Sequence, residues 1–222
     1  MTQDFSQLHC PATFVVVRHA EAAYEQDVLT RDGGWLTAAG RAQAVHLADQ
    51  LAGRRVAAVV TSDLARAVQT AELIAGRLGV GPTVETRAGL REFDIGNWEG
   101  KPRTFSLASV VDAWAAGDLS AGCEGAETGA DIVARFSAVI QDLADQYRGE
   151  TVLVVSHGTA MQLALGTAAT NTTTRFTFGR AVPNCGVAEV ECDENGLRLL
   201  TFMDEVLAPA SEVPIDGGTA GG

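Results

Sequence analysis

The sequence predicts a three-layer α/β/α sandwich whose central sheet is mostly parallel and has an antiparallel edge. Short apolar runs rich in valine alternate with segments whose apolar residues recur at helical spacing, which is typical of parallel strands covered by helices on both faces. Near the end, "GVAEVEC" and "LRLLTFMDE" are joined by "DENG", which indicates a hairpin and hence an antiparallel edge. The 222 residues, 46% of them hydrophobic, suit one compact domain with a sizeable core.

The predicted strands of the parallel part are short and almost uninterrupted in their apolar character. They lie at residues 14–17, at residues 56–62, in the short stretch "TVETRAGL" and in "TVLVVSHG". Strands that are buried on both faces have this composition, because neither face of the sheet meets water.

Between these strands the sequence carries helix signals with recognisable ends. "LTAAGRAQAVHLADQLAG" has Thr37 as a plausible N-cap and Gly53 as a stop, and "DLARAVQTAELIAGRLG" follows the second strand. In "ETGADIVARFSAVIQDLADQY", Thr128 and Asp131 form the pattern of a capping box. Two further helical stretches are predicted at residues 112–116 and from residue 161.

The whole chain, residues 1–222, is predicted to be a single domain with a core at about residues 13–206. Residues 96–126 lack periodicity and are expected to form a cap over the carboxyl edge of the sheet. The tail at residues 208–222, rich in Pro, Gly and small residues, is expected to be flexible. The tryptophans Trp35, Trp98 and Trp114 are interpreted as packing residues.

Charge and cysteine content restrict the partners and the compartment. A net charge of -12 argues against binding to nucleic acid or to an anionic membrane, although a few local arginines can still hold a small anion. The four scattered cysteines and the absence of a secretion signal or of an apolar stretch long enough to cross a bilayer favour a cytoplasmic protein.

Charged side chains follow the predicted strands at the points where those strands end. Arg18 and His19 follow the first strand, Arg66 lies about one turn into the helix after the second, and His157 follows the fourth. Ligands of open α/β sheets bind at the carboxyl ends of strands, so these four residues are expected to converge. Two arginines and two histidines would bind a tetrahedral dianion, and one histidine could attack its phosphorus.

A group that protonates the leaving oxygen is expected in the loop "LREFDIGNWEG", which offers Glu92, Asp94 and Glu99. A metal site is disfavoured because the histidines lack a close ligand spacing and two arginines would lie beside the dication. A serine triad is disfavoured as well, because Ser62 and Ser156 stand at strand ends without a GxSxG elbow.

Several motifs, in order, resemble those of the histidine phosphatase superfamily, in its phosphoglycerate mutase-like branch. "VVVRHAEA" is similar to the family's RHG signature, "LTAAGRAQA" to its LTxxGxxQA helix and "TSDLARAVQTAELIA" to its SxLxRAxQTA element. "LREFDIGNWEG", "EGAETGADIVARF" and "VLVVSHGTAM" resemble the acidic loop, the GGESxxxxxxR helix start and the VSHG motif. The resemblance extends over roughly residues 13–191.

The resemblance implies a role for each of the converging residues. His19 matches the nucleophile that becomes phosphorylated, Arg18 and Arg66 match phosphate-binding arginines, His157 matches the second histidine that holds the phosphoryl group, and Glu92 matches the proton donor. No cofactor and no metal are implied, and the partner is a small phosphorylated substrate; a homodimer is left open.

Two departures from the family pattern concern the phosphate site. Ala20 stands where the family usually has glycine, and the asparagine that many members carry near the position of Glu25 is missing. Thr159 or backbone N–H groups could replace that donor. The "RHAEA" form also resembles phosphohistidine protein phosphatases, although those tend to lack the acidic loop.

The expected function is therefore metal-independent hydrolysis of a small phosphomonoester through a phosphohistidine. Three alternatives stay open: phosphoryl transfer of the mutase type, dephosphorylation of protein phosphohistidine, and a module that binds a phosphorylated ligand without catalysis.

Overall fold

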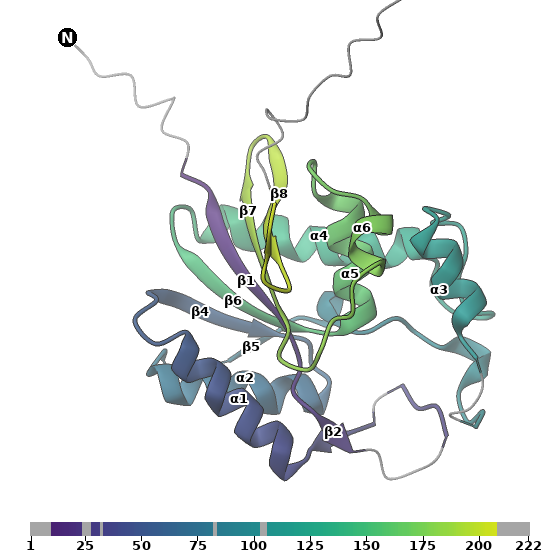
Figure 1. Cartoon of the computed structure of the whole chain (residues 1–222), viewed down its shortest axis with the longest axis horizontal. Coiled ribbons are helices and arrows are strands. Elements are labelled where there is room, and N and C mark those ends of the chain that lie inside the picture. The colour runs from purple at the N-terminus through teal and green to yellow at the C-terminus, as the bar shows by residue number, and fades with distance from the viewer. Residues whose placement is uncertain (1–9, 24–27, 32, 82–83, 103–105, 208–222) are drawn as a thin grey trace, which may run out of the picture.

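The computed structural model describes residues 10–23, 28–31, 33–81, 84–102 and 106–207. A seven-stranded sheet with strand order β5-β4-β6-β1-β7-β8-β9 carries helices on both faces, as Figure 1 shows. The predicted three-layer α/β/α architecture is confirmed. The tail at residues 208–222, predicted to be flexible, lies outside the described residues.

The parallel half of the sheet consists of β1 (Ala12–Arg18), β6 (Thr151–Ser156), β4 (Val56–Thr61) and β5 (Glu85–Thr86). Alternate side chains of β1 enter two different cores: Phe14 and Val16 pack toward one face, and Val15 and Val17 toward the other. All four are fully buried, which explains why the strand is apolar at consecutive positions.

The antiparallel edge is formed by the predicted hairpin, β7 (Val187–Asp193) and β8 (Gly196–Phe202), with β7 paired to β1. A further short strand, β9 (Glu205–Val206), pairs with β8 and was not predicted as a separate element. Along β7 buried and partly exposed residues alternate, as expected for a strand with unequal faces.

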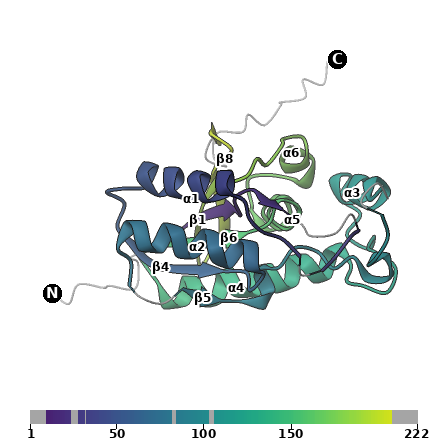
Figure 2. The same ribbon diagram turned by 90° about the horizontal axis from the view of Figure 1, so that it is seen from below.

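Two pairs of helices cover the two faces of the sheet. α1 (Ala38–Gln50) and α2 (Ala65–Leu78) lie side by side on one face (Figures 1 and 2), and α4 (Gly129–Gln146) and α5 (Gly158–Ala168) cover the other. Within the described part of the chain, none of the helices combines the length and the apolar character needed to span a bilayer.

The predicted helix starts are confirmed by their capping bonds. The Thr37 hydroxyl accepts a hydrogen bond from the backbone N–H of Gly40 at 2.9 Å, and Thr128 and Asp131 form a reciprocal capping box at the start of α4. α1 ends at Gln50 and is followed by a turn at residues 51–53, in which the predicted stop, Gly53, has a positive φ of 92°.

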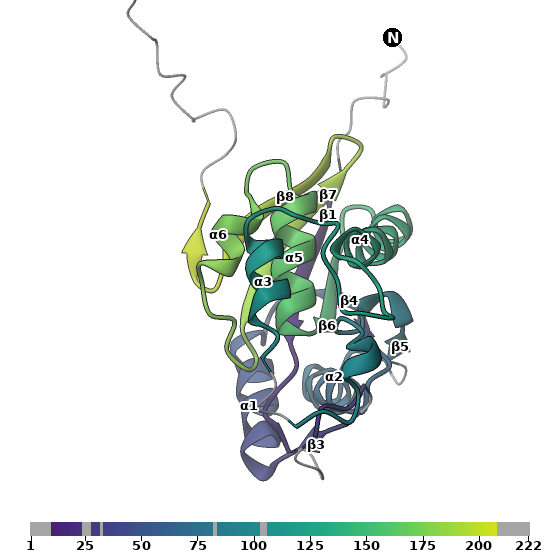
Figure 3. The ribbon, with the colours of Figure 1, turned by 90° about the vertical axis from the view of Figure 1, so that its right-hand side faces the viewer.

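The segment between the acidic loop and α4 contains η3 (Gly96–Trp98) and α3 (Ala108–Ala115), which begins earlier than the helix predicted at residues 112–116. α3 packs against α6 (Thr174–Phe178), a short helix that was not predicted, and Figure 3 shows both beside α5 and apart from α1. That this segment acts as a cap stays a prediction.

The tryptophans divide into packing residues and one exposed side chain. Trp114 is fully buried in α3, and its indole N–H donates to the carbonyl oxygen of Ala121 at 2.8 Å, as expected for a packing residue. Trp98 is half-buried against the same cluster. Trp35, in β3 (Trp35–Leu36) opposite β2 (Ala22–Ala23), is 56% exposed, so its interpretation as a packing residue is wrong.

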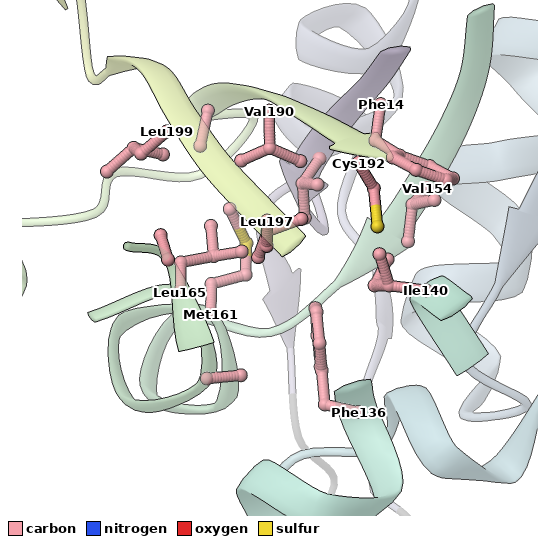
Figure 4. Packing of buried hydrophobic residues seen from close by; sticks show 14 of the residues in the cluster. Phe14, Phe136, Ile140, Val154, Met161, Leu165, Val190, Cys192, Leu197 and Leu199 are labelled. Atoms are coloured by element: carbon pink, nitrogen blue, oxygen red, sulfur yellow. The ribbon is translucent and has the colours of Figure 1, made fainter. Parts of the chain in front are cut away.

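The larger core cluster lies between the sheet and the helices α4 and α5. Figure 4 shows Phe14 and Val154 of the sheet facing Phe136 and Ile140 of α4, with Met161 of α5 beside them. Full burial of side chains of this size contributes roughly 1.5–3 kcal/mol each. The core therefore fixes β1 and β6, and with them the residues that follow their carboxyl ends.

Candidate active site

The predicted convergence of basic residues follows from the strand order. β1 and β6 are parallel neighbours, with Arg18 opposite Ser156, and β4 lies on the other side of β6. Their carboxyl ends share one edge of the sheet, where the rings of His19 and His157 lie with centroids 5.1 Å apart. Arg66, in the first turn of α2, directs its Nε–H to Nε2 of His19 at 3.3 Å.

His19 is held in one tautomer by the backbone. Its Nδ1 lies 2.8 Å from the carbonyl oxygen of Ala20, which can only accept, so Nδ1 carries the proton and Nε2 keeps a lone pair. The pKa of His19 is lowered to about 3, mainly by burial and also by the nearby charges of Arg66 and Arg18, whereas the bond to Ala20 acts in the opposite direction. The imidazole is therefore neutral and nucleophilic at Nε2 near pH 7.

A chain of buried hydrogen bonds fixes His19 relative to α2. The backbone N–H of Ala20 donates to the hydroxyl of Thr70 at 3.0 Å, and that hydroxyl donates to the carbonyl oxygen of Arg66 at 2.7 Å. Asn184 donates from Nδ2 to the carbonyl oxygen of His19 at 3.0 Å. Thr70 and Asn184 were not among the predicted site residues.

His157 is completely buried, and within the described part of the chain one of its two ring nitrogens has a hydrogen-bond partner. Nε2 lies 2.9 Å from the hydroxyl of Ser62, whereas Nδ1 has no hydrogen-bond partner among the described residues. Burial, with smaller contributions from Arg66, His19, Arg135 and Arg18, holds the pKa of His157 well below its usual range. The second histidine is thus also neutral at physiological pH.

Arg18 lies against the first residue of α5. A Cβ atom at Gly158 would lie 3.4 Å from Nε of Arg18, in ordinary van der Waals contact, so the guanidinium group lies close to the start of α5. Nη1 of Arg18 donates to the carbonyl oxygen of Val182 at 2.6 Å, and Nε is buried and has no hydrogen-bond partner among the described residues. One donor of this arginine thus remains for an anion at the end of the sheet.

Glu92 is the carboxylate of the acidic loop that reaches the start of α5. It accepts hydrogen bonds from the backbone N–H groups of Ala160 at 2.8 Å and Thr159 at 3.2 Å. Burial raises the pKa of Glu92, against the opposite effect of these hydrogen bonds and of Arg66. A carboxyl group with a raised pKa is suited to donate and recover a proton. The backbone N–H of Thr159 is engaged here, and a substrate contact of Thr159 stays a prediction.

The other two acids of this loop point to a different partner. Arg31 pairs through Nε with Asp94 at 3.0 Å and with Glu99 at 3.2 Å, and all three side chains are exposed. Of the three acids, Glu92 is the one whose carboxylate contacts the start of α5, and its role as the proton donor stays a prediction.

Arg135 on α4 holds the backbone of the Glu92 loop in place. Its guanidinium donates to the carbonyl oxygens of Gly89, Arg91 and Glu92 at 2.7, 2.8 and 3.2 Å, and it pairs with Glu127 at 2.8 Å. Arg135 is the arginine of the motif "EGAETGADIVARF", but its contact with the acidic loop depends on the packing of α4 and could not be foreseen from spacing.

The place of the missing asparagine, near Glu25, lies outside the described residues. In the part of the chain that the structure describes, no three His, Cys, Asp or Glu side chains come together in a way that would hold a metal ion. The described geometry instead offers a nucleophilic imidazole, two arginines, a second neutral histidine and a carboxyl group with a raised pKa. This set can attack a tetrahedral anion, stabilise its charge and protonate a leaving oxygen.

Comparison with known proteins agrees with this geometry. Residues 14–205 match the profile of the histidine phosphatase superfamily, branch 1. The proteins named probable phosphoglycerate mutase GpmB from Yersinia enterocolitica and Salmonella choleraesuis are 30% and 29% identical to the chain over 159 and 158 residues, which is 68% of this chain and 72% of each relative.

Solved structures share the fold. A mycobacterial glucosyl-3-phosphoglycerate phosphatase superposes with a TM-score of 0.72 at 23% identity, covering 90% of this chain and 100% of the other. Phosphoserine phosphatase from Entamoeba histolytica superposes with a TM-score of 0.70 at 21% identity, covering 87% and 98%. The resemblance predicted from the motifs is therefore confirmed, and the chain belongs to the histidine phosphatase superfamily, branch 1.

Proposed function

We propose that this enzyme hydrolyses the phosphomonoester of a small metabolite, without a metal ion, through a phosphohistidine on Nε2 of His19. The observation that carries the proposal is the fixed tautomer of His19. Its Nδ1–H is bound to the carbonyl oxygen of Ala20, so the nucleophilic lone pair is on Nε2, beside Arg66.

In the first step, Nε2 of His19 attacks the phosphorus atom and the P–N bond forms while the ester P–O bond breaks. The leaving oxygen takes the proton of Glu92, which becomes a carboxylate stabilised by the N–H groups of Thr159 and Ala160. The proton on Nδ1 stays with the imidazole, whose developing positive charge is stabilised by the carbonyl oxygen of Ala20.

In the second step, a water molecule attacks the phosphorus atom from the side that the leaving group vacated. Its proton passes to the carboxylate of Glu92, the P–N bond breaks, and its electron pair returns to Nε2 of His19. Inorganic phosphate leaves, and both residues regain their starting protonation states.

Arg18, Arg66 and His157 are proposed to bind the transferring phosphoryl group. The buried Nε–H of Arg18 and the buried Nδ1 of His157, neither of which has a protein partner among the described residues, support this role. Donors that face developing negative charge in a water-poor site contribute most to such a transition state.

A mutase reaction is the second candidate, favoured by the names of the relatives most similar in sequence. It would use the same phosphohistidine but return the phosphoryl group to another hydroxyl instead of to water. Structural relatives named as phosphatases of glucosyl-3-phosphoglycerate, phosphoserine and α-ribazole phosphate support the hydrolytic alternative and a small substrate. The charge of -12 and the scattered cysteines support a cytoplasmic metabolite rather than nucleic acid as the partner.

The test is a panel of phosphorylated metabolites assayed in EDTA, with phosphate release and isomer formation measured on the same samples. The proposal expects phosphate release that EDTA does not abolish. Interconversion of 3- and 2-phosphoglycerate without release of phosphate would favour the mutase. Turnover of phosphohistidine peptides alone would point to a protein phosphatase, and binding without any turnover would point to a binding module.

A further inference from the structure

Ser62 and His157 form a buried pair, and the proposed reaction assigns a role to His157 but none to Ser62. Ser62 follows β4 and His157 follows β6, and the N–H of Ser62 donates to the carbonyl oxygen of Val155 at 2.9 Å, which fixes the two strand ends relative to each other. Both side chains are fully buried, and Oγ of Ser62 lies 2.9 Å from Nε2 of His157.

The hydrogen atoms of this pair can be assigned by counting donors and acceptors. The hydroxyl of Ser62 already accepts a hydrogen bond from the backbone N–H of Leu64 at 3.3 Å. If Nε2 of His157 carried the proton and donated a hydrogen bond to Oγ of Ser62, two groups would lack a partner among the described residues. These groups are the hydroxyl hydrogen of Ser62 and Nδ1 of His157.

The opposite assignment leaves fewer groups unpaired. If the Ser62 hydroxyl donates to Nε2, that hydroxyl is fully paired, and of the two groups only the Nδ1–H of His157 remains without a partner among the described residues. Leaving a buried polar group unpaired is unfavourable, so the assignment with one unpaired group is preferred over the assignment with two.

We infer that Ser62 is a positioning residue that holds His157 in the Nδ1–H tautomer, so that a neutral His157 donates a hydrogen bond to the transferring phosphoryl group. The inference rests on the proposed function for the identity of the acceptor. In this arrangement the two histidines differ in tautomeric role. His19 directs a lone pair at the phosphorus atom, and His157 donates an N–H to an oxygen bound to that phosphorus atom.

The charges around His157 agree with a neutral donor. Arg66, Arg18 and Arg135 act on it electrostatically, and His19 is the neighbouring ring. These positive surroundings, together with full burial, disfavour a positive charge on the imidazole of His157. His157 can therefore contribute through the direction of its N–H without being charged.

The direct test is nitrogen NMR of the enzyme labelled with ¹⁵N-histidine, in which His157 is assigned by the signal lost in His157→Gln. The inference predicts a pyrrole-like resonance for Nδ1 and a pyridine-like resonance for Nε2 in the wild-type enzyme. A pyrrole-like Nε2 in the wild type would overturn it.

Three variants connect this tautomer to catalysis. Ser62→Ala should yield a mixture of His157 tautomers. It should also weaken vanadate binding and kcat/KM by about tenfold to a hundredfold, by analogy with the loss seen when the bond that orients a metal-binding histidine is removed. Ser62→Thr keeps the hydroxyl and should restore the wild-type tautomer. Thr61→Val is the matched control, because it removes a buried hydroxyl that, among the described residues, donates to the carbonyl oxygens of Ser62 and Val155 and does not hydrogen-bond to His157. The tautomer of His157 and the vanadate affinity of this variant should be unchanged.

Unchanged vanadate affinity in Ser62→Ala, or an equal loss in Thr61→Val, would contradict the inference. Trapping of the phosphoenzyme separates this result from the proposed function. If a phosphohistidine forms but Nε2 of His157 is protonated, the inference fails alone. If no phosphohistidine forms, the proposed function fails, whatever the tautomer of His157.

Discussion

Replacing His19 with glutamine should make the folding stability less sensitive to acid. The pKa of the buried imidazole is about 3, whereas an unfolded histidine has a pKa of about 6.5. Between these two values the unfolded chain binds more protons than the folded one, so the free energy of unfolding falls as the pH falls from about 6.5 toward 3. Above the unfolded pKa this contribution to stability is fully present.

The expected size follows from the two pKa values. The full difference between the folded and unfolded pKa values of His19 corresponds to a loss of about 5 kcal/mol in the free energy of unfolding at low pH. At pH 5 residue 19 is almost fully protonated in the unfolded chain and hardly at all in the folded one. The free energy of unfolding at pH 5 is therefore about 2 kcal/mol lower than at pH 7. His157 is shifted in the same direction and remains in the variant, so the fall with pH should be reduced rather than abolished.

The measurement is urea denaturation of the wild type and of His19→Gln at pH 7 and pH 5. The difference between the two pH values should be smaller in the variant by about 2 kcal/mol. His46→Gln is the control, because His46 lies on the exposed surface of α1; its pH dependence should follow that of the wild type. Parallel pH dependences for the wild type and His19→Gln would refute the claim that His19 is buried in its neutral form.

Two further predictions concern the reaction. Glu92→Gln should lower turnover by about 10²–10⁴-fold for alkyl phosphates and less for p-nitrophenyl phosphate, whose leaving group needs little protonation. Asp94→Asn and Glu99→Gln should lower turnover much less, because both side chains pair with Arg31. A leaving-group series on the three variants checks this, and a steep dependence in Asp94→Asn instead would identify a different acid. Activity should persist in EDTA, and vanadate should bind far more tightly than substrate because it mimics the transferring phosphoryl group; activity that is lost in EDTA and restored by a divalent ion would contradict this.

Much of the fold could be predicted because the signals were local. The apolar strand at residues 14–17, the capping residues Thr37 and Thr128, and the hairpin around "DENG" each depend on a few neighbouring residues, and the structure agrees with them. The short elements β9 and α6 were missed because pairing with β8 and packing against α3 and α5 determine them more than their own sequence does.

In the candidate site, too, the features that depend on neighbouring residues could be predicted and those that depend on strand pairing could not. Arg18, His19, Arg66 and His157 were predicted to converge because each follows or closely follows a strand end, and the structure brings them together. The bond between Ser62 and His157 joins residues 95 positions apart, so it depends on which strands are neighbours and in which register.

Identifying the phosphorylated atom shows whether Nε2 of His19 is the nucleophile. The enzyme is mixed with a turned-over substrate, quenched in base to preserve an acid-labile bond, and examined by ³¹P NMR and peptide mapping. The account predicts a phosphohistidine at His19, with phosphorus on Nε2 because Nδ1 carries the proton bound to Ala20, and no such species in His19→Ala. Phosphorus on Nδ1 of His19, phosphorus on another residue, or full turnover by His19→Ala would contradict it.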